Sequence, residues 1–325
     1  MAFGRPGCGP CGQPQQRRRL LGLTACIGVL FLLAPWLRMF AAAGYGVAWW
    51  SLAAEVHWAR PGSAPAPAQA AAAAAVPKLM HQTWQTKQVP AKWAAARKSC
   101  IDLHPDFEHR LWTDEEGLAF IKKHYPWFLP TYVAYPYSIQ RVDVLRYFLL
   151  HHFGGIYIDL DMGCNKRLDF MLQHNFTAPL THPVGISNDV MAAVPGDAYL
   201  AHIVRRLASW NHWLFIKYIQ VMFSTGPMFL TLQYSMFPNR ADVGIIPADV
   251  YGKYDLSGDP VFYHLHGSSW HADDAQFIFW AEKHKTALLV LGGLLALGLA
   301  GLATARCLIL RQAAARYSPL KTPIE

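Results

Sequence analysis

The chain has 325 residues, of which 53% are hydrophobic and 15% charged, enough for one large domain or two small ones. Its formal net charge of +8 would suit a nucleic-acid-binding protein, but the excess of Lys and Arg lies in the two tails. Residues 41–281 hold 18 Lys and Arg against 19 Asp and Glu, so the charge of the body argues against a nucleic-acid partner.

Two long uncharged segments near the ends of the chain predict membrane-spanning helices. Residues 20–37 follow three arginines at 17–19, and residues 286–305 precede a tail with three more. Each segment is long enough to cross a hydrocarbon core of about 30 Å. Because positive charge favours the cytosolic side, we expect the tails 1–19 and 306–325 in the cytosol and the middle of the chain in a lumen. For the first segment, a cleaved signal peptide is the alternative.

Residues 38–77 are expected to form a stem that links the first span to a globular domain. Within it, residues 59–77 consist mainly of alanine and proline without large apolar side chains, so they cannot build a core. The folded, lumenal domain should therefore extend over residues 78–280.

Two features of this domain depend on its compartment. Cys100 and Cys164 are the cysteines that fall within it, and the sequence leaves open whether they lie close enough to form a disulfide. Asn175 and Thr177 belong to a glycosylation sequon, which is usable only if this region is lumenal.

Strand and helix patterns alternate through the first half of the domain. Residues 78–84 and 107–113 predict strands. Residues 114–125 begin with acidic and end with basic side chains, which is typical of a helix. Residues 138–155 predict a longer helix that two glycines end, and residues 156–160 predict the next strand. The alternation predicts an α/β fold with a mostly parallel sheet, in which ligands bind at the carboxyl ends of the strands.

Asp159 and Asp161 stand at the carboxyl end of that strand. Residues two apart on a strand point to the same face, so the two carboxylates are expected side by side. Paired carboxylates are ligands suited to Mg²⁺ or Mn²⁺, which can bridge a diphosphate. For a single Asp-x-Asp motif, the alternatives are an exposed strand end or a helix cap.

Asp143 and Arg146 lie three residues apart on the expected helix, so they share one face of it. An aspartate there can accept hydrogen bonds from sugar hydroxyls, and an arginine can neutralise an anion. The alternative is a plain ion pair within the helix.

Five short segments occur in order along the domain: "HQTW" at 81–84, "RVDVLRYFLLHHFGGIYIDLDM" at 141–162, "SNDVM" at 187–191, "STGP" at 224–227 and "HLHGSSWH" at 264–271. The ordered set is specific, whereas each piece alone is not. Together the segments resemble the DxD-sugar glycosyltransferases of the Och1-like group (glycosyltransferase family 32), and within that group the mannosyl-inositol-phosphoceramide synthases. The resemblance spans about residues 78–275.

The resemblance implies a GT-A type, Rossmann-like nucleotide-sugar-binding domain, with Mn²⁺ or Mg²⁺ as cofactor and retention of the anomeric configuration. It implies GDP-mannose as the donor and inositol phosphoceramide as the lipid acceptor, a step of sphingolipid biosynthesis. It also implies a Golgi or endoplasmic reticulum membrane with the catalytic domain in the lumen, and a regulatory membrane subunit as partner.

The resemblance also assigns roles to single residues. Asp161 would bind the metal directly, and Asp159 would face both the metal and the ribose. Asp143 and Arg146 would hold the donor sugar. The residues expected beside the nucleotide, on the first strand, are His81, Gln82 and Trp84.

Asn188 and Asp189 would lie under the donor sugar, close to the reacting carbon. The metal would take up the negative charge of the departing nucleoside diphosphate. The sugar then gains oxocarbenium character, which a carboxylate such as Asp189 could stabilise. Two routes stay open at this point: Asp189 could be a nucleophile, or the acceptor hydroxyl could attack the anomeric carbon from the same face of the sugar as the departing diphosphate.

The segment 264–271 is expected to complete the site. His264 and His266 are candidate metal ligands, and the resemblance favours His264, Ser269 and Trp270 closing over the diphosphate. A structural histidine and a core tryptophan are the alternatives for these positions.

Other functions fit parts of this pattern. The same fold could act on a protein glycan or a different glycolipid, and a non-catalytic membrane subunit or a metal-dependent phosphohydrolase would be a different class of protein. The acidic and basic residues of the motifs are intact, which argues against the non-catalytic subunit. A further aromatic run is expected on a helix, in the core or facing a lipid groove: Trp210, Trp213, Phe215 and Tyr218.

Overall fold

The chain divides into two compact units, Met1–Trp270 and His271–Glu325. No helix among the described residues is long and apolar enough to cross a membrane. The predicted spans 20–37 and 286–305 lie outside the described residues, apart from a few positions of the second. Besides scattered single positions near both ends, the computed structural model describes residues 56–62, 76–180, 185–214, 216–253 and 255–267.

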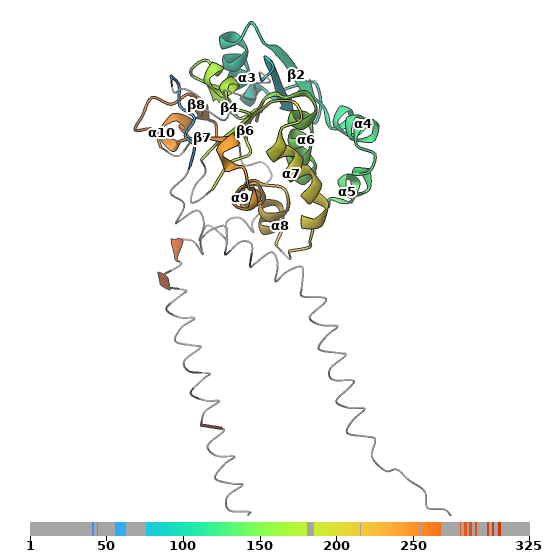
Figure 1. The fold of residues 1–325 in the computed structure, drawn as a ribbon, viewed down its shortest axis with the longest axis vertical. Coiled ribbons are helices and arrows are strands. Elements are labelled where there is room, and N and C mark those ends of the chain that lie inside the picture. Colours follow the sequence, from blue (N-terminus) through green and yellow to red (C-terminus); the bar gives the residue numbers. More distant parts are fainter. Residues whose placement is uncertain are drawn as a thin grey trace, which may run out of the picture. The chain divides into compact units, whose positions relative to one another are not determined.

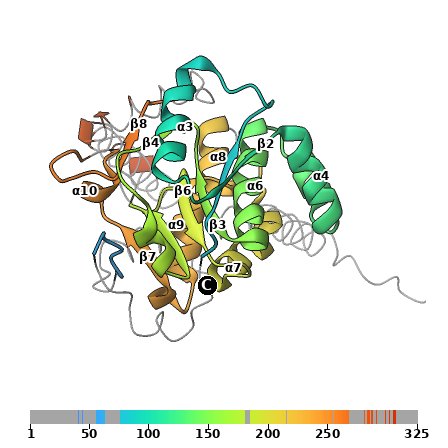
Figure 2. The same ribbon diagram turned by 90° about the horizontal axis from the view of Figure 1, so that it is seen from above.

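A six-stranded sheet forms the centre of the described domain (Figures 1 and 2). Five of its strands run in one direction, and β6 runs antiparallel to both of its neighbours. The predicted α/β domain with a mostly parallel sheet is therefore confirmed. In spatial order the strands are β2 (Glu108–Trp112), β1 (Leu79–Thr83), β3 (Gly155–Ile158), β6 (Val190–Ala193), β5 (Phe176–Pro179) and β7 (Val243–Ile246).

Helices cover both faces of this sheet, because alternate strand residues enter two separate hydrophobic clusters. In β3, Tyr157 belongs to one cluster, and Ile156 and Ile158 belong to the other. Residues of α4, α5, α6, α7 and α9 complete the first cluster, and residues of α3 and α10 help to complete the second. The helices are α3 (Ala91–Leu103), α4 (Asp114–His124), α5 (Leu129–Ala134), α6 (Ser138–Phe153), α7 (Ala198–Arg206), α8 (Lys217–Ser224), α9 (Pro227–Met236) and α10 (Ala248–Tyr251), with the 3₁₀ helices η1 (Asp169–Gln173), η2 (Leu207–Trp210) and η3 (Arg240–Asp242).

The two helices predicted before the Asp-x-Asp motif are confirmed as α4 and α6. A capping box starts α4: the Thr113 hydroxyl accepts from the Glu116 backbone N–H, and the Glu116 carboxylate accepts from the Thr113 backbone N–H. Helix α6 ends at Gly154, which has a φ of 66°. A side chain at Gly155 would place its Cβ 2.3 Å from the Leu79 carbonyl oxygen. The glycine pair therefore lets the chain leave the helix and enter β3 directly beside β1.

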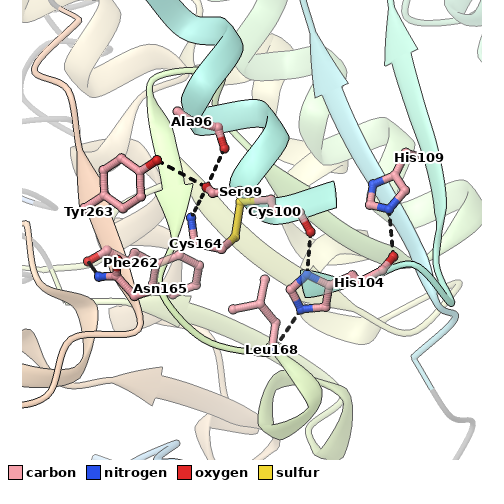
Figure 3. Close-up of a disulfide and its surroundings, with 10 residues drawn as sticks. All are labelled: Ala96, Ser99, Cys100, His104, His109, Cys164, Asn165, Leu168, Phe262 and Tyr263. Atoms are coloured by element: carbon pink, nitrogen blue, oxygen red, sulfur yellow. Dashed lines mark hydrogen bonds between the residues drawn. A yellow bond between two sulfur atoms is a disulfide. The ribbon is translucent and has the colours of Figure 1, made fainter. Parts of the chain in front are cut away.

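A second, two-stranded sheet follows the Asp-x-Asp motif. It pairs β4 (Met162–Cys164) with β8 (Phe262–His264) in antiparallel orientation. Cys100 of α3 and Cys164 of β4 form a disulfide with a Cα–Cα distance of 4.8 Å, which answers the question that the sequence left open (Figure 3). The disulfide fastens the small sheet to α3.

The folded domain includes part of the segment that the sequence assigns to the stem at 38–77. Trp58 forms a parallel bridge with Ile245 of β7, and Ala59 is completely buried. The composition of residues 59–77 gave no sign of this, because a backbone pairing with a sheet edge does not require large side chains.

The aromatic run between Trp210 and Tyr218 is not on one helix, contrary to the prediction. Trp210 ends η2, Trp213 lies in the following loop with 61% of its surface exposed, and Tyr218 belongs to α8. Phe215 lies outside the described residues. Asn211 follows η2 with a φ of -80° and a ψ of 74°, outside the helical conformation.

Candidate active site

Asp159 and Asp161 lie in the turn that joins β3 to β4, rather than on the strand itself. Strand β3 ends at Ile158, and the Met162 backbone N–H donates to the Asp159 carbonyl oxygen at 3.0 Å, which closes the turn. The alternation of a strand therefore does not relate the two carboxylates. Each has its own set of neighbours.

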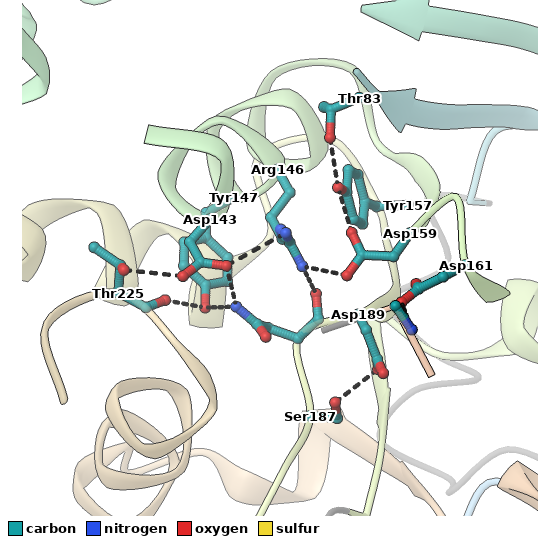
Figure 4. A network of polar contacts seen from close by, with 12 residues as sticks. Thr83, Asp143, Arg146, Tyr147, Tyr157, Asp159, Asp161, Ser187, Asp189 and Thr225 are labelled. Carbon is teal, nitrogen blue, oxygen red and sulfur yellow. Dashed lines mark hydrogen bonds and ion pairs between the residues drawn. The ribbon is translucent and has the colours of Figure 1, made fainter. Parts of the chain in front are cut away.

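Asp159 is held by groups from β3 and α6 (Figure 4). The Tyr157 hydroxyl donates to its Oδ1 at 2.7 Å, and Arg146 Nη1 donates to its Oδ2 at 3.2 Å. Desolvation raises the pKa of Asp159 to about 6; the charges of Asp161 and Asp189 add to this rise, and Arg146 opposes it.

Arg146 connects three parts of the site. Its side chain is 2% exposed; Nη1 also donates to the Asn188 carbonyl oxygen at 2.7 Å, and Nη2 lies 3.3 Å from Asp143 Oδ1. Its guanidinium lies 4.6 Å from the centroid of the Tyr157 ring. Burial alone would lower the pKa of Arg146, but Asp159, Tyr157 and Asp143 raise it above its usual value, so the guanidinium stays charged.

Asp143 uses both carboxylate oxygens inside the protein. Its Oδ1 accepts from Asn188 Nδ2 at 3.0 Å, and its Oδ2 accepts from the Thr225 hydroxyl at 3.0 Å. Burial raises the pKa of Asp143, while Arg146 and these hydrogen bonds oppose the rise. The structure thus brings together Asp143, Arg146 and Asn188 and engages them with one another; their predicted contact with the donor sugar stays a prediction.

Asp189 has a cation of its own. Ser187 Oγ donates to its Oδ1 at 2.6 Å, whereas the Tyr251 hydroxyl and Lys253 Nζ donate to its Oδ2, the latter at 2.7 Å. Burial would raise the pKa of Asp189, but Lys253 and the hydroxyl donors outweigh it and hold the pKa well below its usual range. Asp189 is therefore a fixed, ionised carboxylate.

The candidate nucleotide residues of β1 are largely buried. His81 Nδ1 accepts from Trp112 Nε1 at 3.0 Å, so Nε2 carries the hydrogen and donates to the Gly154 carbonyl oxygen at 3.0 Å. Both ring nitrogens of His81 thus have protein partners, and burial lowers its pKa to about 4. Gln82 is 3% exposed, and its Nε2 has no hydrogen-bond partner among the described residues. Trp84 is partly buried next to them.

The segment before the C-terminal unit reaches the Asp161 carboxylate. His264 Nε2 lies 3.3 Å from Asp161 Oδ2, the Gly267 backbone N–H donates to the same oxygen at 3.1 Å, and His266 contacts His264 at 3.2 Å between their Nδ1 atoms. A Cβ on Gly267 would lie 2.6 Å from Asp161 Oδ2 and 2.5 Å from the Trp93 ring, so only glycine allows this approach. The two further residues expected here lie outside the described residues: Ser269 and Trp270.

The charge balance separates Asp161 from the other site carboxylates. Asp143 and Asp159 share Arg146, and Asp189 pairs with Lys253, but in the described part of the chain no Lys or Arg pairs with Asp161. Within the described residues, the side chain that lies within ion-pair distance of Asp161 is His264.

The donor atoms around Asp161 fit a divalent metal. No group of three or more His, Cys, Asp or Glu suited to a metal ion occurs within the described residues. Two neighbouring ligands of an octahedral Mg²⁺, at about 2.1 Å each, are about 3 Å apart. The 3.3 Å between Asp161 Oδ2 and His264 Nε2 matches this spacing, and a diphosphate could provide further oxygen ligands.

Sequence reasoning missed several side chains that build the site. Ser187 and Thr225 stand inside segments that were singled out, so their hydroxyls could have been named. Tyr251 and Lys253 gave no signal, because they are more than 60 residues from Asp189 in the chain and share no motif with it.

Comparisons with known proteins identify relatives of this chain. The model of a glycosyltransferase sugar-binding region containing a DXD motif matches residues 90–177. Inositol phosphoceramide mannosyltransferase 2 of Schizosaccharomyces pombe is 45% identical over 67% of this chain and 64% of its own length. Inositol phosphoceramide mannosyltransferase 1 of Schizosaccharomyces pombe is 39% identical over 66% of this chain and 68% of its own length. Mannosyl phosphorylinositol ceramide synthase CSH1 of Saccharomyces cerevisiae is 42% identical over 67% of this chain and 58% of its own length. The chain therefore spans less than two thirds of the length of mannosyltransferase 2 and of CSH1.

Solved structures show more distant likenesses. The PaToxG glycosyltransferase aligns with 62% of this chain and 81% of its own, at 15% identity and a TM-score of 0.40. Mouse xyloside xylosyltransferase 1 aligns with 58% of this chain and 97% of its own, at 12% identity and a TM-score of 0.37.

Proposed function

Since the chain belongs to the family of glycosyltransferases with a DXD-containing sugar-binding region, we propose that it transfers mannose from GDP-mannose to inositol phosphoceramide. Relatives whose names state this acceptor support the proposal. The structural observation that carries it is Asp161, a site carboxylate whose charge no Lys or Arg among the described residues balances.

Asp161 and His264 would hold Mn²⁺ or Mg²⁺ together with the diphosphate of the donor. When bound there, the metal neutralises the negative charge of the leaving nucleoside diphosphate. His266, which contacts His264 and is exposed, could provide a further nitrogen ligand to the metal. Asp159, with 28% of its side chain exposed, lies at the edge of the same turn, where it can accept from the ribose.

The buried side of the site would hold the donor sugar in place. Asp143 orients the Asn188 side chain, and Arg146 fixes the Asn188 backbone and the Asp159 carboxylate. Because these groups already bind one another, they need no rearrangement when the donor arrives, which is the advantage of a preorganised site. Arg146 thus acts on the donor mainly through the residues that it orients.

Asp189 would act as a fixed charge rather than as a nucleophile. Both of its carboxylate oxygens accept hydrogen bonds, and Lys253 forms an ion pair with it, so its lone pairs are poorly available for attack. A negative charge held close to the reacting carbon stabilises the oxocarbenium character of the transition state. This favours attack by the acceptor hydroxyl over a covalent intermediate on Asp189.

We also propose the membrane topology that the sequence predicts, with two spans at 20–37 and 286–305 and the catalytic domain in the Golgi lumen. The Cys100–Cys164 disulfide supports it, because disulfides persist in oxidising compartments. A regulatory membrane subunit stays a prediction from the resemblance. Protease added to sealed microsomes should trim both tails and spare residues 78–280; degradation of the domain in intact vesicles would refute this topology.

The function is tested with the purified full-length chain in vesicles that contain inositol phosphoceramide. With Mn²⁺ and radiolabelled GDP-mannose, we expect a mannosylated lipid product, and Asp161→Asn should abolish most of it. UDP-sugars and a soluble oligomannose glycan serve as competing donor and acceptor. Transfer to the glycan alone, or transfer of another sugar to the lipid, would replace the proposed function.

A further inference from the structure

The segment 57–60 extends the main sheet at the free side of β7. The Ala59 backbone N–H donates to the Ile245 carbonyl oxygen at 2.8 Å, and the Ile245 backbone N–H donates to the His57 carbonyl oxygen at 2.7 Å. Ala59 is completely buried in the same hydrophobic cluster as Val250 and Tyr251 of α10. The segment therefore contacts both the sheet edge and the helix that follows β7.

An ion pair joins the same segment to α10. Arg60 donates two hydrogen bonds to Asp249, from Nη1 at 2.7 Å and from Nη2 at 3.1 Å. A two-point contact of this kind fixes orientation as well as distance. Asp249 is the second residue of α10, so the contact acts on the start of this helix.

Helix α10 depends on such neighbours for its position. It has four residues and ends at Gly252, whose φ is 80°. A helix of one turn is not stable on its own, because nucleation is unfavourable and few hydrogen bonds reward it. Groups packed against α10 therefore determine where it lies.

The position of α10 matters for the site because of what it carries. Tyr251 is its last residue, Lys253 follows two residues later, and both donate to Asp189 Oδ2. Lys253 is the only cation paired with Asp189 among the residues that the structure describes. A small shift of α10 would move a hydroxyl and an ammonium group away from this carboxylate.

We infer that residues 57–60 form a positioning strand, which holds α10 so that Tyr251 and Lys253 keep Asp189 in place. The catalytic consequence rests on the proposed function, whereas the hold on α10 does not. The segment that leads towards the predicted N-terminal span is thus coupled to the catalytic carboxylate through Arg60, Asp249 and α10.

The ion pair is tested in the full-length chain with Arg60→Ala, Asp249→Ala and the exchanged pair Arg60→Asp with Asp249→Arg. Each single variant should lower kcat about two- to fivefold, the range of an exposed ion pair, without changing KM for the donor. The exchanged pair should recover at least half of the loss. Lys98→Ala, which removes an exposed ion pair with Asp102 on α3, is the matched control and should keep full kcat. Unchanged kcat in both single variants, or an equal loss in the control, would overturn the inference.

The backbone pairing is tested with Ala59→Pro, which removes the N–H that donates to Ile245. Hydrogen exchange should become about tenfold faster at the amides of Val250 and Tyr251, as expected for the loss of one buried hydrogen bond, and stay unchanged in α6. Unchanged exchange in α10 would overturn the inference. If the wild-type chain transfers no mannose to inositol phosphoceramide, the proposed function fails, but the exchange result still decides whether this strand holds α10.

Discussion

The carboxylates in two regions of the site differ in their hydrogen-bond and ion-pair partners. The buried network consists of Asp143, Arg146, Asn188, Thr225 and, at its rim, Asp159; in it, every carboxylate oxygen has a protein donor. The β4–β8 corner consists of Asp161, His264, His266 and Gly267; Asp161 there has a backbone N–H and a histidine as neighbours. In the network each carboxylate shares a buried arginine, whereas in the corner no Lys or Arg among the described residues pairs with Asp161.

The two aspartates of the single Asp-x-Asp motif belong to different regions, Asp159 to the network and Asp161 to the corner. Asp159 and Asp161 are two residues apart, yet Arg146 balances the first, and no Lys or Arg in the described ranges balances the second. The motif therefore has one aspartate that is paired with a buried arginine and one whose described neighbours are a histidine and a backbone N–H. The predictions that follow test this contrast, from the largest expected effect to the smallest.

Replacing Arg146 with Met should destabilise the protein most. The change keeps an apolar stem but leaves Asp143 and Asp159 without their shared cation, and breaking a buried ion pair costs about 3–5 kcal/mol. The free energy of unfolding, measured by urea denaturation, should fall by that amount. Arg141→Met on the same helix is the control, since Arg141 donates to the Tyr135 carbonyl and takes no part in the hydrogen bonds and ion pairs of the network. A loss below about 1 kcal/mol in Arg146→Met would show that the network is not a stabilising unit.

His81 of β1 makes the stability of the domain depend on pH. Its pKa is lowered from 6.5 to about 4, so the neutral ring stabilises the folded state fully above pH 6.5. This contribution is lost as pH falls from 6.5 to 4, at about 1.4 kcal/mol per unit, or about 3 kcal/mol in all. The wild-type chain should therefore lose more stability over this range than His81→Gln. Parallel curves for the two proteins would contradict the neutral, buried ring.

Asp161→Asn should lower activity without lowering stability. A metal site contributes several kcal/mol to catalysis, so we expect turnover to fall about a hundredfold or more, which corresponds to nearly 3 kcal/mol. The amide oxygen can still accept from the Gly267 backbone N–H, and no Lys or Arg within the described ranges loses a partner. Unfolding should change by less than about 1 kcal/mol. A large loss of stability would place Asp161 with the network instead.

Thr225→Val makes a small change inside the network. The methyl group replaces the hydroxyl that donates to Asp143 Oδ2, at nearly constant volume. Leaving one buried acceptor without its donor costs about 1–2 kcal/mol of unfolding free energy. Thr231→Val in α9 is the comparison outside the network: it leaves the Ile186 backbone N–H without its acceptor, so it should cost a similar amount of stability while Asp143 keeps its contacts. Equal stability of wild-type and Thr225→Val protein would mean that Asp143 does not depend on this contact.

The sequence predicted those parts of the fold that local pattern controls. The capping residues of α4, the glycines after α6 and the apolar strand before Asp159 each determine their own conformation, so their elements were predicted within a few residues. The aromatic run after Trp210 was assigned wrongly, because apolar side chains at helical spacing do not by themselves fix a helix.

The environment of the site carboxylates could not be predicted in the same way. Strand alternation predicted that Asp159 and Asp161 share one face and one environment. In the structure, Asp159 contacts Arg146 of α6 and Asp161 contacts His264 of β8, and only the tertiary fold brings these two elements to the turn. Lys253 reaches Asp189 across 64 residues, and residues 57–60 join the sheet through backbone groups that carry no residue signature.

Binding of Mn²⁺ in the presence of GDP, followed by electron paramagnetic resonance, tests the contrast between the two regions most directly. The account predicts that the wild-type chain and Thr225→Val bind Mn²⁺ with similar affinity, and that Asp161→Asn loses this binding. Wild-type affinity in Asp161→Asn, or loss of Mn²⁺ in Thr225→Val, would contradict it.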